Sequence, residues 1–417
     1  MKDTKQQWFK DAKYGLFIHF GLFSLLGGVY KGKETQGLSE WIMNDMNIPE
    51  EEYRALIKEF NPTYFSAKYI VSKAKEWGMR YIVLTVKHHE GFALYNSRCS
   101  SYNVMNTPYG KDILKEMQQE CLQQGIVLGV YYSQAQDWDD PNGYRSNYDN
   151  SQKQFEKYLH EKCLPQIKEI LTGYGPLGIM WFDTPMQMTE AQSREIFNTV
   201  KRLQPSCIVS GRIGNGIGEY MTAGDNSIPA EPFPGDWEVP ATLNDTWGYS
   251  KVDDNWKNPQ KLIRLLLKIN SRGGNYLLNI GPKPDGTLPE ETVRILNEVG
   301  KYVRENEDSI FGTMRLPKYP YEIPEVLFTT KLHKLFIHVI EPICKPNLYL
   351  LNIGNQIQKV TLLKTDEELQ FENGICCEGE HFINIFLPVE FRKRAYYCLC
   401  VEYVEENPEF EPIRDCE

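Results

Sequence analysis

Short apolar runs alternate with longer amphipathic stretches along the first three quarters of the chain, which is the pattern of repeated βα units. The apolar runs are nearly continuous in hydrophobicity, as strands buried on both faces of a parallel sheet must be. Predicted strands cover residues 15–20, 81–86, 126–132, 178–182, 208–210 and 276–280. Predicted helices cover residues 67–77, 112–124, 152–172, 190–203 and 259–270, with Gly78, Gly125 and Gly173 as expected C-caps.

Six or more such units over roughly 310 residues predict an α/β fold of the (β/α)8-like (TIM-type) barrel class. No Gly-x-Gly-x-x-Gly turn follows the first predicted strand, which argues against a doubly wound dinucleotide-binding sheet. In a barrel, the side chains that end the strands face one common pocket. The predicted strand ends are polar or aromatic: His19, Lys87-His88-His89, Tyr131-Tyr132-Ser133, Trp181-Phe182-Asp183, Ser210-Gly211-Arg212 and Asn279.

The pattern changes after about Met314, where a Pro-rich stretch leads into short β-type runs. These runs cover residues 326–330, 335–340 and 395–401, and turn-forming Asn, Gly and Pro residues separate them. This spacing is typical of an antiparallel sandwich. The chain is therefore predicted to consist of a catalytic barrel over residues 1–314 and a C-terminal antiparallel β-sandwich domain over residues 315–417.

The net charge of the chain limits which classes of binding partner are expected. The chain has 417 residues, and its 46 Lys and Arg against 56 Asp and Glu give a formal net charge of −10. A nucleic-acid partner is not expected, because it would need a basic surface to neutralise phosphates. No apolar run of about 18 residues is present, so no membrane partner is expected. The N-terminal residues lack an apolar stretch of signal-peptide length, so we expect a cytoplasmic protein unless a leader was removed.

Aromatic residues make up 12% of the chain, and their flat rings suit stacking on sugars. The 10 Cys are scattered, with neither zinc-ribbon spacing nor the density of a disulfide scaffold. We therefore expect a reducing compartment, with no metal and no cofactor. The aromatic C-terminal domain offers surface for self-association as a homo-oligomer.

Asp183 is the first candidate catalytic residue, because it directly follows the predicted strand 178–182. A helix N-cap at the strand-to-helix turn is the ordinary structural interpretation of such an Asp. A carboxylate at the carboxyl end of a barrel strand, flanked by Trp181, is equally consistent with a nucleophile in an aromatic pocket.

His88 and His89 end the second predicted strand, and together with His19 they place three of only 7 His at strand ends. We expect the two adjacent imidazoles to point to opposite sides of the strand, so that both could not easily hold one ion. The His-Glu-x-x-His spacing of zinc proteases is absent. These residues favour a polar binding site, with structural histidines and a metal-dependent hydrolase as the alternatives.

Glu238 provides a second carboxylate, beside Trp237. Asp225 and Glu219 compete with it from a loop rich in Gly and Pro. Two carboxylates on different strand ends are what glycoside hydrolysis requires, one ionised to attack the anomeric carbon and one protonated to release the leaving oxygen.

In these residues the chain resembles the α-L-fucosidases of glycoside hydrolase family 29. The resemblance covers essentially the whole predicted barrel, and the number and order of the shared motifs make it specific. The motifs are Trp8-Phe9-x-x-Ala12-Lys13-Tyr14-Gly15-Leu16-Phe17-Ile18-His19-Phe20-Gly21, Ser39-Glu40-Trp41, Phe60-Asn61-Pro62, residues 81–92, Gly129-Val130-Tyr131-Tyr132-Ser133, Trp181-Phe182-Asp183, Trp237-Glu238, Thr246-Trp247-Gly248-Tyr249 and residues 271–282.

The resemblance implies a retaining exo-glycosidase that removes terminal α-L-fucose from fucosylated glycans or glycosides through a covalent intermediate on Asp183. Glu238 is the first choice for the acid/base, with Asp225 and Glu219 in reserve, and burial beside Trp237 together with the Asp183 charge should raise the pKa of Glu238. The implied fucose-binding residues are His19, Glu40, Trp41, His88, His89, Tyr131, Trp181, Arg212, Trp237 and Trp247.

A catalytically inactive carbohydrate-binding protein on the same fold is the alternative function, although the chain retains both Asp183 and a candidate acid. Residues 134–148 are rich in Asp, Asn and Trp, and they are either part of the rim on the leaving-group side or a solvated loop.

Overall fold

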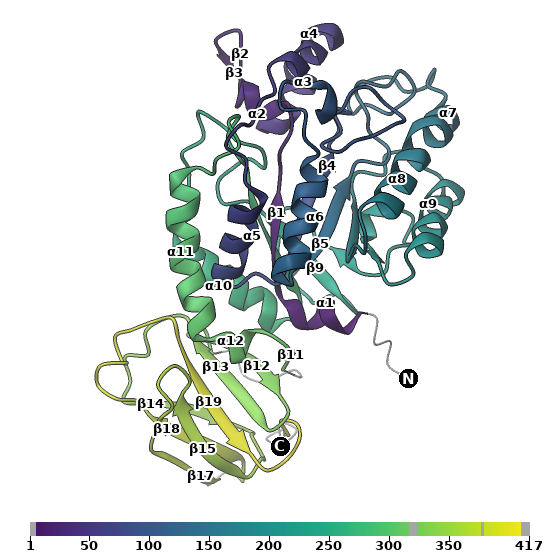
Figure 1. The fold of residues 1–417 in the computed structure, drawn as a ribbon. Coiled ribbons are helices and arrows are strands. Elements are labelled where there is room, and N and C mark those ends of the chain that lie inside the picture. The colour runs from purple at the N-terminus through teal and green to yellow at the C-terminus, as the bar shows by residue number, and fades with distance from the viewer. Residues whose placement is uncertain (1–5, 317–322, 377–378, 410–417) are drawn as a thin grey trace. The chain divides into compact units, whose positions relative to one another are not determined.

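Eight strands form one sheet that closes on itself (Figure 1). We describe the protein from a computed structural model, which covers residues 6–316, 323–376 and 379–409. The strand order is β7-β6-β5-β4-β1-β10-β9-β8, and an isolated parallel bridge between Ser210 and Tyr220 joins the two edges. The predicted (β/α)8-like barrel is therefore confirmed. Its strands are β1 (Tyr14–Ile18), β4 (Tyr81–Lys87), β5 (Val127–Tyr132), β6 (Ile179–Phe182), β7 (Ile208–Val209), β8 (Met221–Thr222), β9 (Trp237–Ala241) and β10 (Asn275–Ile280).

Helices separate most of these strands in sequence, as parallel strands require. They are α1 (Gln7–Ala12), α2 (Phe23–Leu26), α3 (Ile42–Asp45), α4 (Glu50–Arg54), α5 (Ala67–Glu76), α6 (Ile113–Gln124), α7 (Phe155–Tyr158), α8 (Leu164–Gly173), α9 (Glu190–Leu203), α10 (Pro259–Ser271), α11 (Glu290–Glu305) and α12 (Glu307–Ile310). Shorter 3₁₀ segments are η1 (Ser39–Trp41), η2 (Ala55–Lys58), η3 (Val104–Asn106) and η5 (Gly211–Ile213), and η4 (Leu159–Cys163) is a π-helical turn. A small hairpin of β2 (Val29–Tyr30) and β3 (Lys33–Glu34) completes this part of the chain.

Side-chain caps explain where the main barrel helices begin. Ser66, Asp112 and Asn258 each accept a hydrogen bond from a backbone N–H in the first turn, and Thr189 forms a full capping box with Gln192. Gly125 ends α6 with a φ of 68°, as predicted. The prediction for Gly173 is wrong, because this residue is the last of α8 and Tyr174 follows it as the C-cap.

Two barrel strands, β8 and β9, were not predicted from sequence. Strand β8 has two residues, which is too short for a hydrophobic pattern. Strand β9 contains Glu238 and Pro240, and both residue types are depleted in strands. The predicted helix over 152–172 is also interrupted, since η4 inserts a π-turn just before Pro165 of α8.

Glycine provides the room that large side chains occupy inside the barrel. A Cβ on Gly15 of β1 would lie 2.3 Å from the Tyr81 ring, so this ring crosses the barrel over a residue without a side chain. A Cβ on Gly129 of β5 would lie 2.7 Å from the Cβ of Ile179 on the adjacent strand. These close approaches leave no space for substitution.

The C-terminal part forms two antiparallel sheets, as predicted. One has the order β11-β12-β13-β19-β15-β16 and the other has the order β14-β18-β17. Their core consists of alternating buried residues such as Leu335, Ile337 and Val339 of one sheet and Leu348, Leu350 and Ile383 of the other. The strands are β11 (Met314–Arg315), β12 (Val326–Lys331), β13 (Lys334–Val339), β14 (Asn347–Leu351), β15 (Ile357–Leu362), β16 (Glu367–Glu368), β17 (Phe371–Ile375), β18 (His381–Phe386) and β19 (Tyr397–Tyr403).

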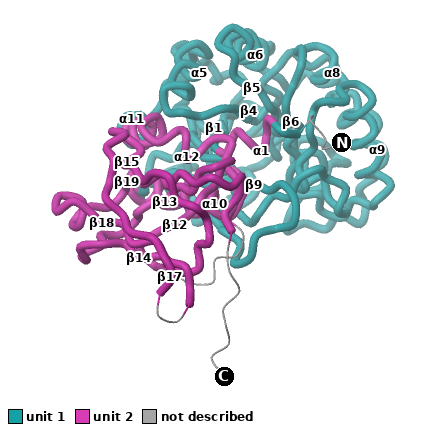
Figure 2. The backbone as a smooth tube through the Cα atoms, turned by 90° about the horizontal axis from the view of Figure 1, so that it is seen from below, with its two compact units in different colours: residues 1–7, 14–257, 276–297 teal, residues 8–13, 258–275, 298–417 magenta. Residues whose placement is uncertain are grey.

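Contacts divide the chain into two compact units (Figure 2). The first comprises residues 1–7, 14–257 and 276–297, and the second comprises residues 8–13, 258–275 and 298–417. The predicted domain boundary between residues 314 and 315 falls within the second unit. The division into two domains at this position stays a prediction.

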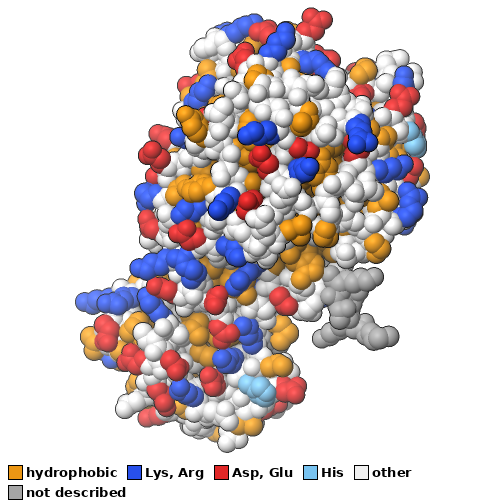
Figure 3. Space-filling view, in the orientation of Figure 1, with side chains coloured by type: hydrophobic (Ala, Val, Ile, Leu, Met, Phe, Trp, Pro, Cys, Tyr) orange, Lys and Arg blue, Asp and Glu red, His pale blue; other side chains and the backbone are white. Residues whose placement is uncertain are grey.

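Surface charge is mixed on the visible face of the molecule. Figure 3 shows Lys and Arg side chains interspersed with Asp and Glu, so the negative net charge is not gathered into one patch there. Among the described residues, every helix falls short of the length and hydrophobicity that crossing a membrane requires.

Gly129→Ala tests the packing inside the barrel. The added methyl group would press on Ile179, so the free energy of unfolding should fall by about 1–3 kcal/mol. Gly173→Ala is the matched control, because its Cβ would have no atom within 4 Å. Urea denaturation followed by circular dichroism measures both, and equal stability of the two variants would contradict the packing argument.

Candidate active site

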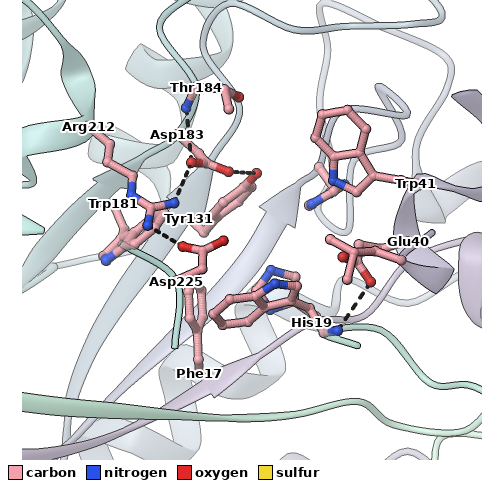
Figure 4. Close-up of a pocket in the computed structure, with 13 residues that line it drawn as sticks. Phe17, His19, Glu40, Trp41, Tyr131, Trp181, Asp183, Thr184, Arg212 and Asp225 are labelled. Carbon is pink, nitrogen blue, oxygen red and sulfur yellow. Dashed lines mark hydrogen bonds and ion pairs between the residues drawn. The ribbon is translucent and has the colours of Figure 1, made fainter. Parts of the chain in front are cut away.

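A cavity of about 120 Å³ lies at the carboxyl ends of the barrel strands (Figure 4). Ten of the residues that line it were predicted as site residues from sequence: His19, Glu40, Trp41, His88, Tyr131, Trp181, Asp183, Arg212, Asp225 and Trp247. Phe17, Leu38 and Thr184 complete the lining and were missed. Phe17 could have been found, because it lies two positions before His19 in the predicted strand 15–20 and so was expected on the same face.

Asp183 occupies the centre of the polar side of this cavity. Its Oδ1 is 3.0 Å from Arg212 Nη1, and its Oδ2 accepts a hydrogen bond of 3.0 Å from the Tyr131 hydroxyl. His89 Nε2 is 3.6 Å from the same Oδ2. In Figure 4, Arg212 lies between Asp183 and Asp225, while Trp41 and Glu40 lie on the opposite side.

The charge of Asp183 is stabilised by these neighbours. Burial alone would raise the pKa of this carboxyl, but the charge of Arg212 lowers it, and hydrogen bonds from Arg212 and Tyr131 add to the effect. The pKa of Asp183 is therefore below its ordinary value, and the group is a carboxylate at neutral pH.

The backbone around Asp183 is held in a strained geometry. Thr184 has a φ of 40°, a left-handed conformation that costs a β-branched residue about 1–3 kcal/mol. Gln136 Nε2 donates to Thr184 Oγ1 at 3.1 Å, and Gln134 Oε1 accepts from the backbone N–H of Asp183 at 2.9 Å. The amide nitrogen of Gln134 donates to the carbonyl of Arg212 at 3.0 Å, so one side chain connects both members of the ion pair. No sequence pattern indicated this role for Gln134.

Three rings at the carboxyl ends of adjacent strands form a stack along one wall. Tyr131 of β5 stacks with Trp181 of β6, its register partner, with ring centroids 5.5 Å apart. On its other face it stacks with His88 at 5.4 Å. Arg212 in turn lies over the Trp181 ring at 5.0 Å, so the stack supports the cation that pairs with Asp183.

His88 and His89 do not point to opposite sides, which corrects the expectation from strand geometry. Their rings lie side by side with centroids 4.3 Å apart; His88 lines the cavity and His89 approaches Asp183. The register between β4 and β5 shifts between Thr85 and Lys87, and strand β4 ends at Lys87, so simple alternation does not extend to the two histidines. No group of three His, Cys, Asp or Glu among the described residues is arranged to hold a metal ion.

Buried polar atoms with no protein partner face this region. Glu40 Oε2 accepts hydrogen bonds from Thr246 Oγ1 and from the backbone N–H groups of Trp247 and Gly248. Glu40 Oε1 and His88 Nδ1 have no partner among the described residues. Since a buried polar group without a partner is costly, these two atoms mark where a polar ligand would bind.

The histidines of the site are uncharged at neutral pH. Burial lowers the pKa of His19 to about 3 and that of His89 to about 4. His19 Nδ1 is hydrogen-bonded to Asn279 Oδ1 at 2.7 Å, and His89 Nδ1 to Ser133 Oγ at 2.6 Å. Neutral imidazoles fixed in this way can donate and accept hydrogen bonds to hydroxyl groups.

Glu238 lies deeper in the barrel than the cavity. Its Oε1 accepts from Trp181 Nε1 at 2.9 Å and its Oε2 from the Tyr81 hydroxyl at 2.5 Å, and its side chain is fully buried. Burial raises its pKa to about 7, which agrees with the predicted direction, while hydrogen bonds from Tyr81 and Trp181 act in the opposite sense. Its neighbour Trp237 is also buried and, like Glu238, is not among the residues of the described cavity wall.

The two other candidate carboxylates occupy different environments. Asp225 lines the cavity, its side chain is 44% exposed, and it forms an ion pair with Arg212 Nη2. Glu219 instead accepts from Lys201 Nζ at 2.9 Å and from the backbone N–H of Val209 at 3.0 Å. Glu219 therefore connects helix α9 to strand β7, and these contacts indicate a structural role.

A buried ion cluster holds the loop between β5 and α7. Asp137 Oδ2 is 2.9 Å from Lys87 Nζ and 2.9 Å from Lys162 Nζ, and Lys87 also donates to the Tyr158 hydroxyl. Burial alone would raise the pKa of Asp137, but the two lysines lower it to about 2. This cluster fixes the loop from which Gln134 and Gln136 contact the residues around Asp183.

Known proteins are similar to this chain in sequence and in fold. A family model described as α-L-fucosidase matches residues 1–308. The chain is similar to the α-L-fucosidase of Dictyostelium discoideum, with 28% identity over 418 residues that cover 93% of this chain and 86% of the relative. A solved α-L-fucosidase from Vibrio sp. strain EJY3 has a TM-score of 0.91 and 30% identity, covering 99% of this chain and 75% of that chain. AlfC from Lactobacillus casei, solved with α-L-fucose product, has a TM-score of 0.70 and 44% identity, covering 73% of this chain and 100% of that chain.

Asp137→Asn tests the buried ion cluster. The change leaves two largely buried lysines without their shared counter-charge, so the free energy of unfolding at pH 7 should fall by about 3–5 kcal/mol. Because the folded-state pKa of Asp137 is lowered to about 2, its contribution is present at neutral pH and is lost as the pH falls through this value. The difference between variant and parent should therefore shrink in acid.

Glu190→Gln is the control, because it removes one partner of an exposed ion pair with Arg194. Urea denaturation at pH 7 and at low pH should leave this control close to the parent. A stability loss in Asp137→Asn that is as small as in the control would refute the role of the cluster.

Proposed function

Since the chain belongs to the α-L-fucosidase family, glycoside hydrolase family 29, we propose that it is a retaining exo-glycosidase acting on terminal α-L-fucose of fucosylated glycans or glycosides. The observation that carries this proposal is the pair of carboxylates, Asp183 and Asp225, bound to opposite ends of the Arg212 guanidinium in one cavity. Retaining glycosidases need two carboxylates close together, one as nucleophile and one as acid/base. The complex of AlfC with α-L-fucose supports the identity of the sugar.

Asp183 is the proposed nucleophile. Its carboxylate is kept ionised by Arg212, and its oxygen Oδ2 also accepts a hydrogen bond from Tyr131. In the first step this carboxylate attacks the anomeric carbon while the glycosidic bond breaks, which forms a covalent fucosyl ester. In the second step a water molecule cleaves the ester and releases fucose with its original anomeric configuration.

Asp225 is the acid/base that the geometry favours among the three sequence candidates. It lines the cavity and is partly open to solvent, from which the second step takes its water. Trp181 separates Glu238 from the cavity. Glu238 is fully buried and accepts a hydrogen bond from the Trp181 indole. The acid/base gives a proton to the leaving oxygen in the first step and takes one from water in the second.

Recognition of fucose is assigned to the unpaired and neutral polar groups of the wall. Glu40 Oε1 can accept from a sugar hydroxyl, and His88 Nδ1 can bind one as donor or acceptor. Phe17 and Trp247, with ring centroids 5.9 Å apart, offer an apolar surface for the C6 methyl group. A pocket matched to hydroxyl groups rejects sugars that lack them, because its buried polar atoms would then stay unpaired.

Asp183→Ala should abolish turnover of an aryl α-L-fucoside, lowering kcat by roughly 10⁴-fold or more because the attacking group is lost. Release of 4-nitrophenol measures the rate. Azide should give either no recovery or β-fucosyl azide, the inverted product. Near-normal activity of this variant would eliminate the proposed nucleophile.

Asp225→Ala and Glu238→Gln separate the two acid/base candidates. Loss of Asp225 should lower kcat on a natural fucoside by roughly 10²–10⁴-fold, with less effect on an aryl fucoside whose leaving group needs little protonation. Azide should then restore turnover and yield α-fucosyl azide, the retained product. Glu238→Gln preserves an acceptor for Trp181 and should keep most activity; the reverse pattern would assign the acid/base to Glu238 instead.

A further inference from the structure

A second and larger cavity shares chain segments with the candidate active site. Its volume is about 810 Å³, against about 120 Å³ for the first cavity, so it has room for more than one sugar ring. Ten residues line it: Glu34, Thr35, Gln36, Gly37, Asn44, Asp45, Met46, Asn47, Asn147 and Tyr148.

The chain segment from β3 to α3 contributes residues to both cavities and so locates the second relative to the first. Leu38 lines the first cavity and the preceding Gly37 lines the second. Trp41 lines the first, and Asp45, four residues later along η1 and α3, lines the second. Residues four apart on a helix lie about 5–6 Å from each other. The second cavity therefore begins about one helical turn from the fucose-binding wall, as the next sugars of a glycan would.

The opposite wall comes from the loop that also braces the active site. This loop follows β5; Gln134 and Gln136 contact the residues around Asp183, and Asn147 and Tyr148 line the second cavity. The loop thus lines the second cavity and contacts residues that line the first, while residues between 37 and 45 line parts of both, so the two cavities are neighbours.

Tyr148 is held in place with its ring accessible. Its hydroxyl donates to Asn47 Oδ1, and the Arg145 guanidinium stacks on its ring at 4.1 Å. Arg145 Nε also donates to Asn44 Oδ1 at 2.9 Å, so the two walls are connected by hydrogen bonds. Tyr148 as a whole residue is nevertheless 41% exposed. A fixed, exposed aromatic ring costs little conformational entropy when a sugar packs against it.

The lining groups match a neutral polyhydroxylated ligand. Four side-chain amides and the hydroxyls of Thr35 and Tyr148 can each donate and accept hydrogen bonds. Glu34 and Asp45 are acidic, and no Lys or Arg belongs to the described lining. This balance disfavours an anionic ligand.

We propose that this second cavity binds the leaving-group oligosaccharide of the substrate, a neutral glycan of two or more sugar residues, with Tyr148 as its aromatic platform. The inference rests on the proposed function and deepens it, because it assigns the sugars on the far side of the cleaved bond to residues 34–37, 44–47 and 147–148. A substrate with a long neutral leaving group then gains binding energy that a small aryl leaving group cannot.

The test compares kcat/KM for a neutral fucosylated tetrasaccharide with kcat/KM for 4-nitrophenyl α-L-fucoside. Tyr148→Ala should lower the ratio of the two values by roughly tenfold, the expected effect of losing one stacking ring. Tyr148→Phe keeps the ring and loses only the hydrogen bond to Asn47, so it should keep most of the parent ratio. Tyr69→Ala, at a ring that is 44% exposed on α5, should leave the ratio unchanged.

An unchanged ratio in Tyr148→Ala, or an equal fall in Tyr69→Ala, would overturn the inference. The proposed function fails separately, namely if the parent protein does not hydrolyse the aryl fucoside. Because the aryl rate is measured in every variant, misfolding lowers both rates together and is distinguished from a loss of leaving-group binding.

Discussion

The ion pair between Asp183 and Arg212 is the interaction on which the active site depends. A carboxylate that is only 13% exposed needs a fixed counter-charge to stay ionised, and Arg212 supplies it at 3.0 Å. Arg212 in turn is positioned by the Trp181 ring, by the carbonyl of Ala223 and, through its own carbonyl, by Gln134. The stack of His88, Tyr131 and Trp181 therefore supports the ion pair of Asp183, the proposed nucleophile, as well as the shape of the cavity.

The loop after β5 contacts the residues around this ion pair and also lines the second cavity. Its first part is fixed by the Lys87–Asp137–Lys162 cluster and holds the strained backbone at Thr184 through Gln136. Its last part, through Arg145 and Tyr148, is joined to Asn44 and Asn47 on the other side of the second cavity. Since one loop supports both regions, changes that loosen it should affect the proposed chemical step and the proposed leaving-group binding together.

The barrel and the cavity residues at its strand ends could be predicted because both follow from local patterns, whereas Glu40, Trp41 and Trp247 were predicted only through the resemblance to the α-L-fucosidases. Buried strands are continuous apolar runs, and a barrel brings their ends together, which places His19, Tyr131, Trp181 and Asp183 in one site. The bridging role of Gln134 could not be predicted, since it depends on two segments that meet only in the folded chain. Nor could the orientation of His88 and His89, which depends on a register shift between neighbouring strands.

The pKa of a carboxyl and its position in the fold point to different residues as the acid/base. A raised pKa was expected to mark the catalytic acid, and burial does raise the pKa of Glu238 to about 7. Burial raises the pKa of Glu40 and Glu90 to about 7 as well, although Glu40 binds backbone amides at the cavity wall and Glu90 accepts from Tyr53 and Leu22 in the interior. A raised pKa therefore reports burial, which these three carboxyls share. Access to the cavity is a separate requirement for the proposed acid/base, and Asp225 meets it because the loop after β8 carries its carboxylate there, whereas Trp181 lies between Glu238 and the cavity.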